Sequence, residues 1–155
     1  MALFKFTDKI IKGQAIPVYN NGKMMRDFTY VDDIVEGIIR VIDLLPEANQ
    51  ESDPSPATST APYRIYNIWN QQPVELKRYI EVLETLLGKK AQLELLPMQP
   101  GDIPNTYADV NHLEEAVGVL PHTAVEEGIS RFVEWYQSYY GVSDTGQVIQ
   151  HKEIT

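Results

Sequence analysis

Strand-like and helix-like segments alternate along this chain, and this alternation constrains its fold more than any other feature. Segments rich in β-branched and aromatic residues are predicted as strands over 15–19, 27–31, 63–70 and 91–97. Apolar residues at helical spacing predict helices over 1–13, 32–45, 71–90, 111–118 and 123–141. Because helices repeatedly follow strands, the sequence predicts an α/β fold.

Residues near the helix ends predict where three of these helices begin. Asp33 with Glu36, and Thr123 with Glu126, have the spacing of a capping box. In that arrangement each side chain bonds a free backbone N–H group of the first turn. Pro73 suits the first turn of the helix over 71–90, because proline has no N–H to leave unpaired there.

Composition excludes several classes of function. The net charge of the 155 residues is −9 and the cationic residues are thinly spread, so no basic patch for nucleic acid is predicted. The chain has no cysteine, which excludes disulfides and thiolate metal sites. No apolar run approaches the roughly 20 residues of a membrane span. No signal peptide is recognised ahead of Lys5 and Asp8. We therefore expect a cytoplasmic protein with no membrane or nucleic-acid partner.

Tyr19 and Lys23 fit the pattern Tyr-x-x-x-Lys, which is the catalytic pair of a large class of NAD-dependent enzymes. In that pair both side chains must lie on one face of a helix, one turn apart. The residues between them here are Asn20, Asn21 and Gly22, which favour turns over helices. The segment is therefore predicted to be a hairpin-like turn between two strands, and we reject the catalytic interpretation.

Two side chains could contribute to a nucleotide site. Arg26 lies where a predicted strand begins, and an arginine there can bind a phosphate through paired hydrogen bonds. The alternative is a solvated arginine or a partner for Asp27. Asp102 follows Pro100 and Gly101, so a firm loop presents its carboxylate, which can accept two hydroxyl hydrogen bonds from a ribose. The alternative is an ordinary turn.

The other polar clusters favour structural roles. Asp32, Asp33 and Glu36 could suggest a divalent metal, but capping and compensation of the helix macrodipole account for them. The three histidines are isolated and lack metal-type spacing; they are His112, His122 and His151. No metal site is predicted.

Several segments together resemble the C-terminal part of extended short-chain dehydrogenase/reductase enzymes, the NAD-dependent epimerase/dehydratase family that acts on nucleotide sugars. These segments are RDFTYVDD with the following helix, YRIYNIWN, PVELKRYIEVLE and LPMQPGDIPNTYAD. MALFKF, SPATSTAPYRIYN and Gln99 before PGD resemble the UDP-glucuronate 4-epimerases in particular. The resemblance implies an α/β, Rossmann-type enzyme. This chain would be its C-terminal substrate-binding portion, without the N-terminal NAD-binding sheet.

The resemblance also implies roles for individual residues. Arg26 matches the arginine that binds the nucleotide diphosphate, and Asp102 matches the acid that binds the uridine ribose. Gln99 stands where many relatives have a second phosphate-binding arginine, so one charged contact is missing. Val18 and Tyr19 match the strand that runs past the uracil, and Thr106 matches a position that lines the sugar pocket. A small residue at position 106 would leave room for a bulky or charged sugar.

In this family, NAD binds to a glycine-rich strand–turn–helix, and a Tyr-x-x-x-Lys pair on a helix takes a hydroxyl proton. Neither element is recognised here. The expected parent reaction converts UDP-glucuronate to UDP-galacturonate by transient oxidation at C4, with NAD in the parent enzyme and none bound to this chain. We expect a substrate-binding domain over 1–140 with a few Rossmann elements, a flexible tail over 141–155, and a fragment that is inactive alone.

The resemblance predicts self-association as well. In relatives the helix over 33–45 and the strand that follows pack onto the nucleotide-binding sheet, so their apolar faces are expected to be uncovered here. We expect a UDP-sugar ligand and a homo-oligomer, with exchange of elements between chains as one route. Two other interpretations stay open: a non-catalytic UDP-sugar-binding module, and half of a nucleotide-sugar 4,6-dehydratase or decarboxylase.

Overall fold

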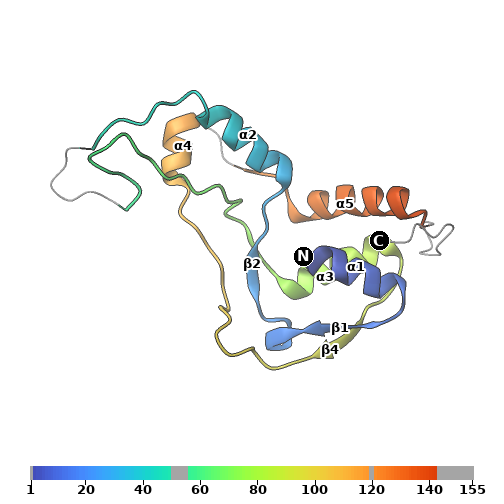
Figure 1. Ribbon diagram of the computed structural model, residues 1–155. Helices are drawn as coiled ribbons and strands as arrows, with labels where there is room; N and C mark the ends of the chain where they lie inside the picture. The colour runs from blue at the N-terminus through green and yellow to red at the C-terminus, as the bar shows by residue number, and fades with distance from the viewer. Residues whose placement is uncertain (1, 50–55, 119–120, 143–155) are drawn as a thin grey trace. The chain divides into compact units, whose positions relative to one another are not determined.

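The computed structural model describes residues 2–49, 56–118 and 121–142, and the chain divides into two compact units (Figure 1). Unit 1 comprises residues 1–26, 73–106 and 124–155, and unit 2 comprises residues 27–72 and 107–123. Helices and strands both occur, so the predicted α/β class is confirmed. Most of the tail predicted over 141–155 lies outside the described residues.

Helices supply most of the core of unit 1. They are α1 (Ala2–Ile11), α3 (Leu76–Leu87) and α5 (Val125–Tyr140). Each has an apolar stripe, and α3 packs against both α1 and α5. Ile10, Leu83 and Ile129 represent the three stripes and are at most 2% exposed. Gly88 ends α3 in the left-handed region, with φ 62°, as its position in the sequence predicts.

Two pairs of short strands complete unit 1. β1 (Ala15–Val18) runs parallel to β4 (Gln92–Leu95), with Val18 opposite Leu95, which confirms both predicted strands. β2 (Met25–Asp27), whose last residue begins unit 2, pairs with β3 (Pro73–Glu75). The turn over 19–23 therefore does not form a hairpin, because β1 and β2 belong to different pairs.

Unit 2 contains α2 (Val31–Val41) and α4 (Asn111–Val117), which lie side by side (Figure 1). Gly37 lets the segment around Ile68 approach α2, since a Cβ at position 37 would lie 3.1 Å from the Ile68 Cδ1 atom. The Asn67 side chain donates a 3.0 Å hydrogen bond to the Asp109 carbonyl. None of the described helices has the length and apolar character to cross a membrane.

Several predicted elements differ from the structure. Residues 63–70 are not a strand, and only an isolated bridge joins Thr58 to Arg64. A strand needs a neighbour for its backbone groups, and the described part of unit 2 offers no strand beyond the end of β2. The strand expected over 27–31 is instead β2, since α2 already begins at Val31. That helix ends at Val41 rather than at position 45, and Pro73 lies in β3 rather than in a helix.

Both predicted capping boxes are wrong. The residues that precede the helices make no side-chain cap, and they are Tyr30 for α2 and Ala124 for α5. The Asp33 carboxylate instead accepts hydrogen bonds from the N–H and the hydroxyl of Thr123, at 3.1 and 3.0 Å. Glu36 and Glu126 form ion pairs with arginines. Long-range partners thus take Asp33, Thr123 and Glu126, and Glu36 pairs with Arg40 one turn further along α2.

Candidate functional site

Arg26 and Asp102, which are 76 residues apart in the sequence, meet in unit 1. The Arg26 Nη2 atom lies 3.2 Å from Asp102 Oδ1. The Nη1 atom of the same guanidinium donates to the carbonyls of Met25 and Pro104, at 3.0 and 3.2 Å. The Arg26 head group is therefore tied to the loop that carries Asp102. The neighbouring Asp27 carboxylate accepts the backbone N–H groups at positions 71 and 72, at 2.8 and 3.4 Å.

Backbone hydrogen bonds hold the start of β2 against this loop. The Met25 N–H donates to the Pro104 carbonyl at 2.9 Å, and the Thr106 N–H donates to the Met25 carbonyl at 3.2 Å. These two hydrogen bonds flank Asn105, which forms an isolated parallel bridge with Met25. Thr106, which is half-buried, therefore follows Asp102 within one short, bonded segment.

A tight turn fixes the direction of Asp102. The Asp102 N–H donates to the Gln99 carbonyl at 3.1 Å, and Gly101 has φ 83°. Proline followed by a glycine with positive φ is the sequence preference of a type II turn. The Asp102 Oδ1 atom also accepts a 2.8 Å hydrogen bond from the Ile103 N–H. The ordinary turn that sequence offered as an alternative is thus present, and it is also what presents the carboxylate.

The remaining predicted site residues lie at or after the ends of β1 and β4. They are Val18, Tyr19 and Gln99. Val18 ends β1, and its carbonyl accepts a 3.0 Å hydrogen bond from the Leu96 N–H just after β4. The Val18 side chain is only 1% exposed, so it belongs to the core. Tyr19 is half-buried and Gln99 is exposed. The structure therefore brings Arg26, Asp102 and the backbone at Thr106 together directly. Gln99 joins them through its carbonyl in the turn, and Val18 and Tyr19 connect to it through the pairing of β1 with β4.

The Arg26–Asp102 pair is only partly shielded from water, with side chains 25% and 34% exposed. No described residue hydrogen-bonds to the Arg26 Nε atom or to Asp102 Oδ2. The site can therefore still offer a donor to an anion and an acceptor to a hydroxyl group. Sequence reasoning missed Met25, Ile103 and Pro104. They act through backbone groups, for which residue type gives no signal.

The Tyr19–Lys23 motif lies on a turn, as predicted. Residues Tyr19–Gly22 form a short 3₁₀ segment, η1, in which Asn20 and Asn21 both have φ 51°. Left-handed backbone at two successive residues breaks any helical face. The two side chains are therefore not presented one turn apart on an α-helix.

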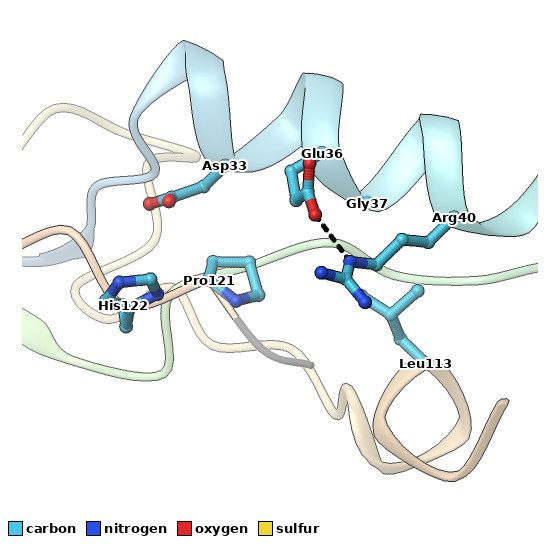
Figure 2. A pocket seen from close by; sticks show the side chains of 7 residues that line it. All are labelled: Asp33, Glu36, Gly37, Arg40, Leu113, Pro121 and His122. Atoms are coloured by element: carbon cyan, nitrogen blue, oxygen red, sulfur yellow. Dashed lines mark hydrogen bonds and ion pairs between the residues drawn. The ribbon is translucent and has the colours of Figure 1, made fainter. Parts of the chain in front are cut away.

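Two members of the acidic cluster of α2, Asp33 and Glu36, line a small hollow in unit 2, shown in Figure 2. Its volume is about 30 Å³, which is close to that of one water molecule. Glu36 pairs with Arg40 along α2, and Asp33 is bonded to the segment at Thr123. No group of three or more potential metal ligands occurs among the described residues. His112 contacts the Arg64 guanidinium at 2.7 Å, and that neighbouring cation disfavours a metal there.

Comparison with known proteins gives consistent matches. The model of the NAD dependent epimerase/dehydratase family matches residues 1–68. Protein CapI of Staphylococcus aureus is 50% identical over 90% of this chain, and a probable UDP-glucuronate 4-epimerase of Rhizobium meliloti is 46% identical over 90%. These matches cover 43% and 42% of the two relatives, so the chain spans less than half their length.

The fold matches solved structures as well. UDP-glucuronic acid 4-epimerase from Bacillus cereus, in complex with UDP-glucuronic acid and NAD, superposes with a TM-score of 0.72 at 20% identity. The match covers 90% of this chain and 40% of that one. By sequence and by fold, this chain is therefore similar to members of the NAD-dependent epimerase/dehydratase family, and it spans less than half the length of the relatives it matches.

Proposed function

We propose that this chain forms the substrate-binding side of a UDP-glucuronate 4-epimerase and that its ligand is a UDP-sugar. The observation that carries the proposal is the meeting of Arg26 and Asp102 at 3.2 Å within one unit. In this role the guanidinium binds the diphosphate and the carboxylate accepts the ribose hydroxyls. The similarity to a probable UDP-glucuronate 4-epimerase supports the choice of sugar.

The other predicted site residues have narrower roles in this proposal. Gln99 begins the turn and can offer a neutral hydrogen bond to the diphosphate where many relatives offer a charge. Val18 is buried, so contact with the uracil falls to its backbone and to Tyr19. Thr106 lies beside the turn, where its small side chain leaves space for the glucuronate group.

NAD does not fit the residues described here. The sequence has no Gly-x-x-Gly-x-x-Gly strand–turn–helix, and the described strands form two separate pairs rather than a nucleotide-binding sheet. The proposal therefore assigns to these residues the binding and orientation of the UDP-sugar, and no step of the oxidation and reduction. The epimerisation itself is proposed for the longer parent enzyme, with a cytoplasmic location.

Calorimetric titration of UDP and UDP-glucuronate tests the proposal. Arg26→Ala should weaken UDP binding at least about tenfold, because a hydrogen bond to a charged group contributes roughly 1.5–3 kcal/mol. Arg131→Ala is the matched control, since Arg131 belongs to an exposed ion pair on α5 of the same unit. Equal UDP affinity in the original chain and in Arg26→Ala would contradict the proposal.

A further inference from the structure

The two side chains proposed to bind different parts of one ligand bind each other in this structure. Arg26 Nη2 donates to Asp102 Oδ1 at 3.2 Å. The same oxygen accepts the Ile103 N–H, so the carboxylate is directed toward the guanidinium by its own loop. The contact therefore depends on the conformation of the loop as well as on the two side chains.

Asp102 is not what holds Arg26 in place. The Nη1 group is anchored by two carbonyls, those of Met25 and Pro104. Backbone hydrogen bonds that do not involve Asp102 hold these carbonyls in place. The Met25 N–H donates to the Pro104 carbonyl, and the Thr106 N–H donates to the Met25 carbonyl. The main effect of Asp102 on Arg26 is therefore electrostatic: it cancels the charge that an anionic ligand would meet.

This cancellation has different consequences for two kinds of anion. Inorganic pyrophosphate at Arg26 must compete with the carboxylate or lie beside it, and two like charges at this distance repel. A nucleoside diphosphate also brings ribose hydroxyls, which can donate to the carboxylate as the guanidinium turns to the phosphates. The Asp102 carboxylate then exchanges its bond to Arg26 for hydrogen bonds from the ribose of the same ligand.

We infer that Asp102 is an internal counter-ion of Arg26 and makes occupation of the site depend on a ribose diol, so that it selects nucleoside diphosphates over bare anions. The inference rests on the proposed function and goes beyond it. Asp102 then does more than attract the ribose, because it also weakens the binding of anions that have no ribose.

The test compares Asp102→Asn with the original chain for two ligands, inorganic pyrophosphate and UDP, by calorimetry without divalent metal. Asparagine keeps the shape and an acceptor for the Ile103 N–H but removes the charge. Pyrophosphate should bind roughly fivefold more tightly, which corresponds to releasing one partly exposed ion pair. UDP should bind roughly tenfold more weakly, because a charged acceptor for the diol is lost.

Further measurements make the test decisive. Glu127→Gln is the control, because it removes the same charge from an exposed ion pair in the same unit and should change neither affinity. Asp102→Ala serves as a second variant, and circular dichroism verifies that each variant is folded. UDP lacking both ribose hydroxyls should lose affinity in the original chain and lose little in Asp102→Asn.

The outcomes separate the inference from the proposed function. A pyrophosphate affinity that is unchanged or lower in Asp102→Asn overturns the inference, as does failure of both chains to bind pyrophosphate. UDP binding that does not depend on Arg26 overturns the proposed function, whatever pyrophosphate does. Opposite shifts for pyrophosphate and UDP support both.

Discussion

The turn that presents Asp102 offers a direct test of how backbone conformation controls the site. Gly101 has φ 83°, and a Cβ added there would meet no atom within 4 Å. Substitution by alanine therefore introduces conformational strain and no steric clash. For a residue with a side chain, left-handed backbone costs roughly 1–2 kcal/mol. The turn should relax toward negative φ to avoid this cost, and that movement reorients Asp102.

Gly13 provides a control with the same kind of strain away from the site. It follows α1 with φ 65°, and an added Cβ there also meets nothing within 4 Å. Gly101→Ala and Gly13→Ala should each lower the free energy of unfolding by about 1 kcal/mol, measured by urea denaturation. Only Gly101→Ala should weaken UDP binding, by about tenfold in calorimetry, because only this turn directs Asp102. Gly101→Asn should recover part of the loss, since asparagine tolerates left-handed backbone.

Two results would refute this reasoning. If Gly101→Ala unfolds at the same urea concentration as the original chain, the positive φ at Gly101 carries no strain. If Gly101→Ala loses stability as Gly13→Ala does but keeps its UDP affinity, the turn does not position Asp102 for binding.

Three other properties follow from the structure. Burial and the nearby Asp8 carboxylate raise the pKa of Tyr136 to about 12. The stability that this hydroxyl contributes is therefore complete below about pH 10 and is lost as pH rises through 12. Between these pH values, the free energy of unfolding should fall less in Tyr136→Phe than in the original chain. Asp33→Ala should lower the free energy of unfolding by roughly 1–3 kcal/mol in urea, because two donors of Thr123 lose their acceptor, and unchanged stability would exclude that contact. Ile42, just after α2, is 71% exposed; the chain should self-associate in light scattering at micromolar concentration, and Ile42→Lys should reduce this, whereas a strictly monomeric profile would refute it.

Local patterns predicted those parts of the fold that depend on local interactions. The amphipathic stripes of α1, α3 and α5 appear as predicted, because helical hydrogen bonds join residues four apart. Gly88 ends a helix and Asn20–Gly22 form a turn for the same reason, since their backbone preferences act at single residues. The rejection of Tyr19–Lys23 as a helical pair rested on this kind of information and agrees with the structure.

The candidate site was only half predictable. Arg26 and Asp102 could be named individually, but their contact joins residues 76 apart, and the carbonyls that anchor Arg26 have no signature in residue type. Val18 was named for its place on a strand near the uracil, but the burial of its side chain depends on how β1 packs and could not be read from the sequence.

The sequence by itself determined the helices, the left-handed turns and the residue types available for phosphate and ribose recognition. The tertiary structure alone decided which strands pair, why residues 63–70 form no strand, and why Asp33 bonds Thr123 rather than the start of its own helix. The physical reason is range. Backbone preferences and helical contacts act within a turn or two, whereas strand pairing and ion pairs take whichever partner the folded chain brings near.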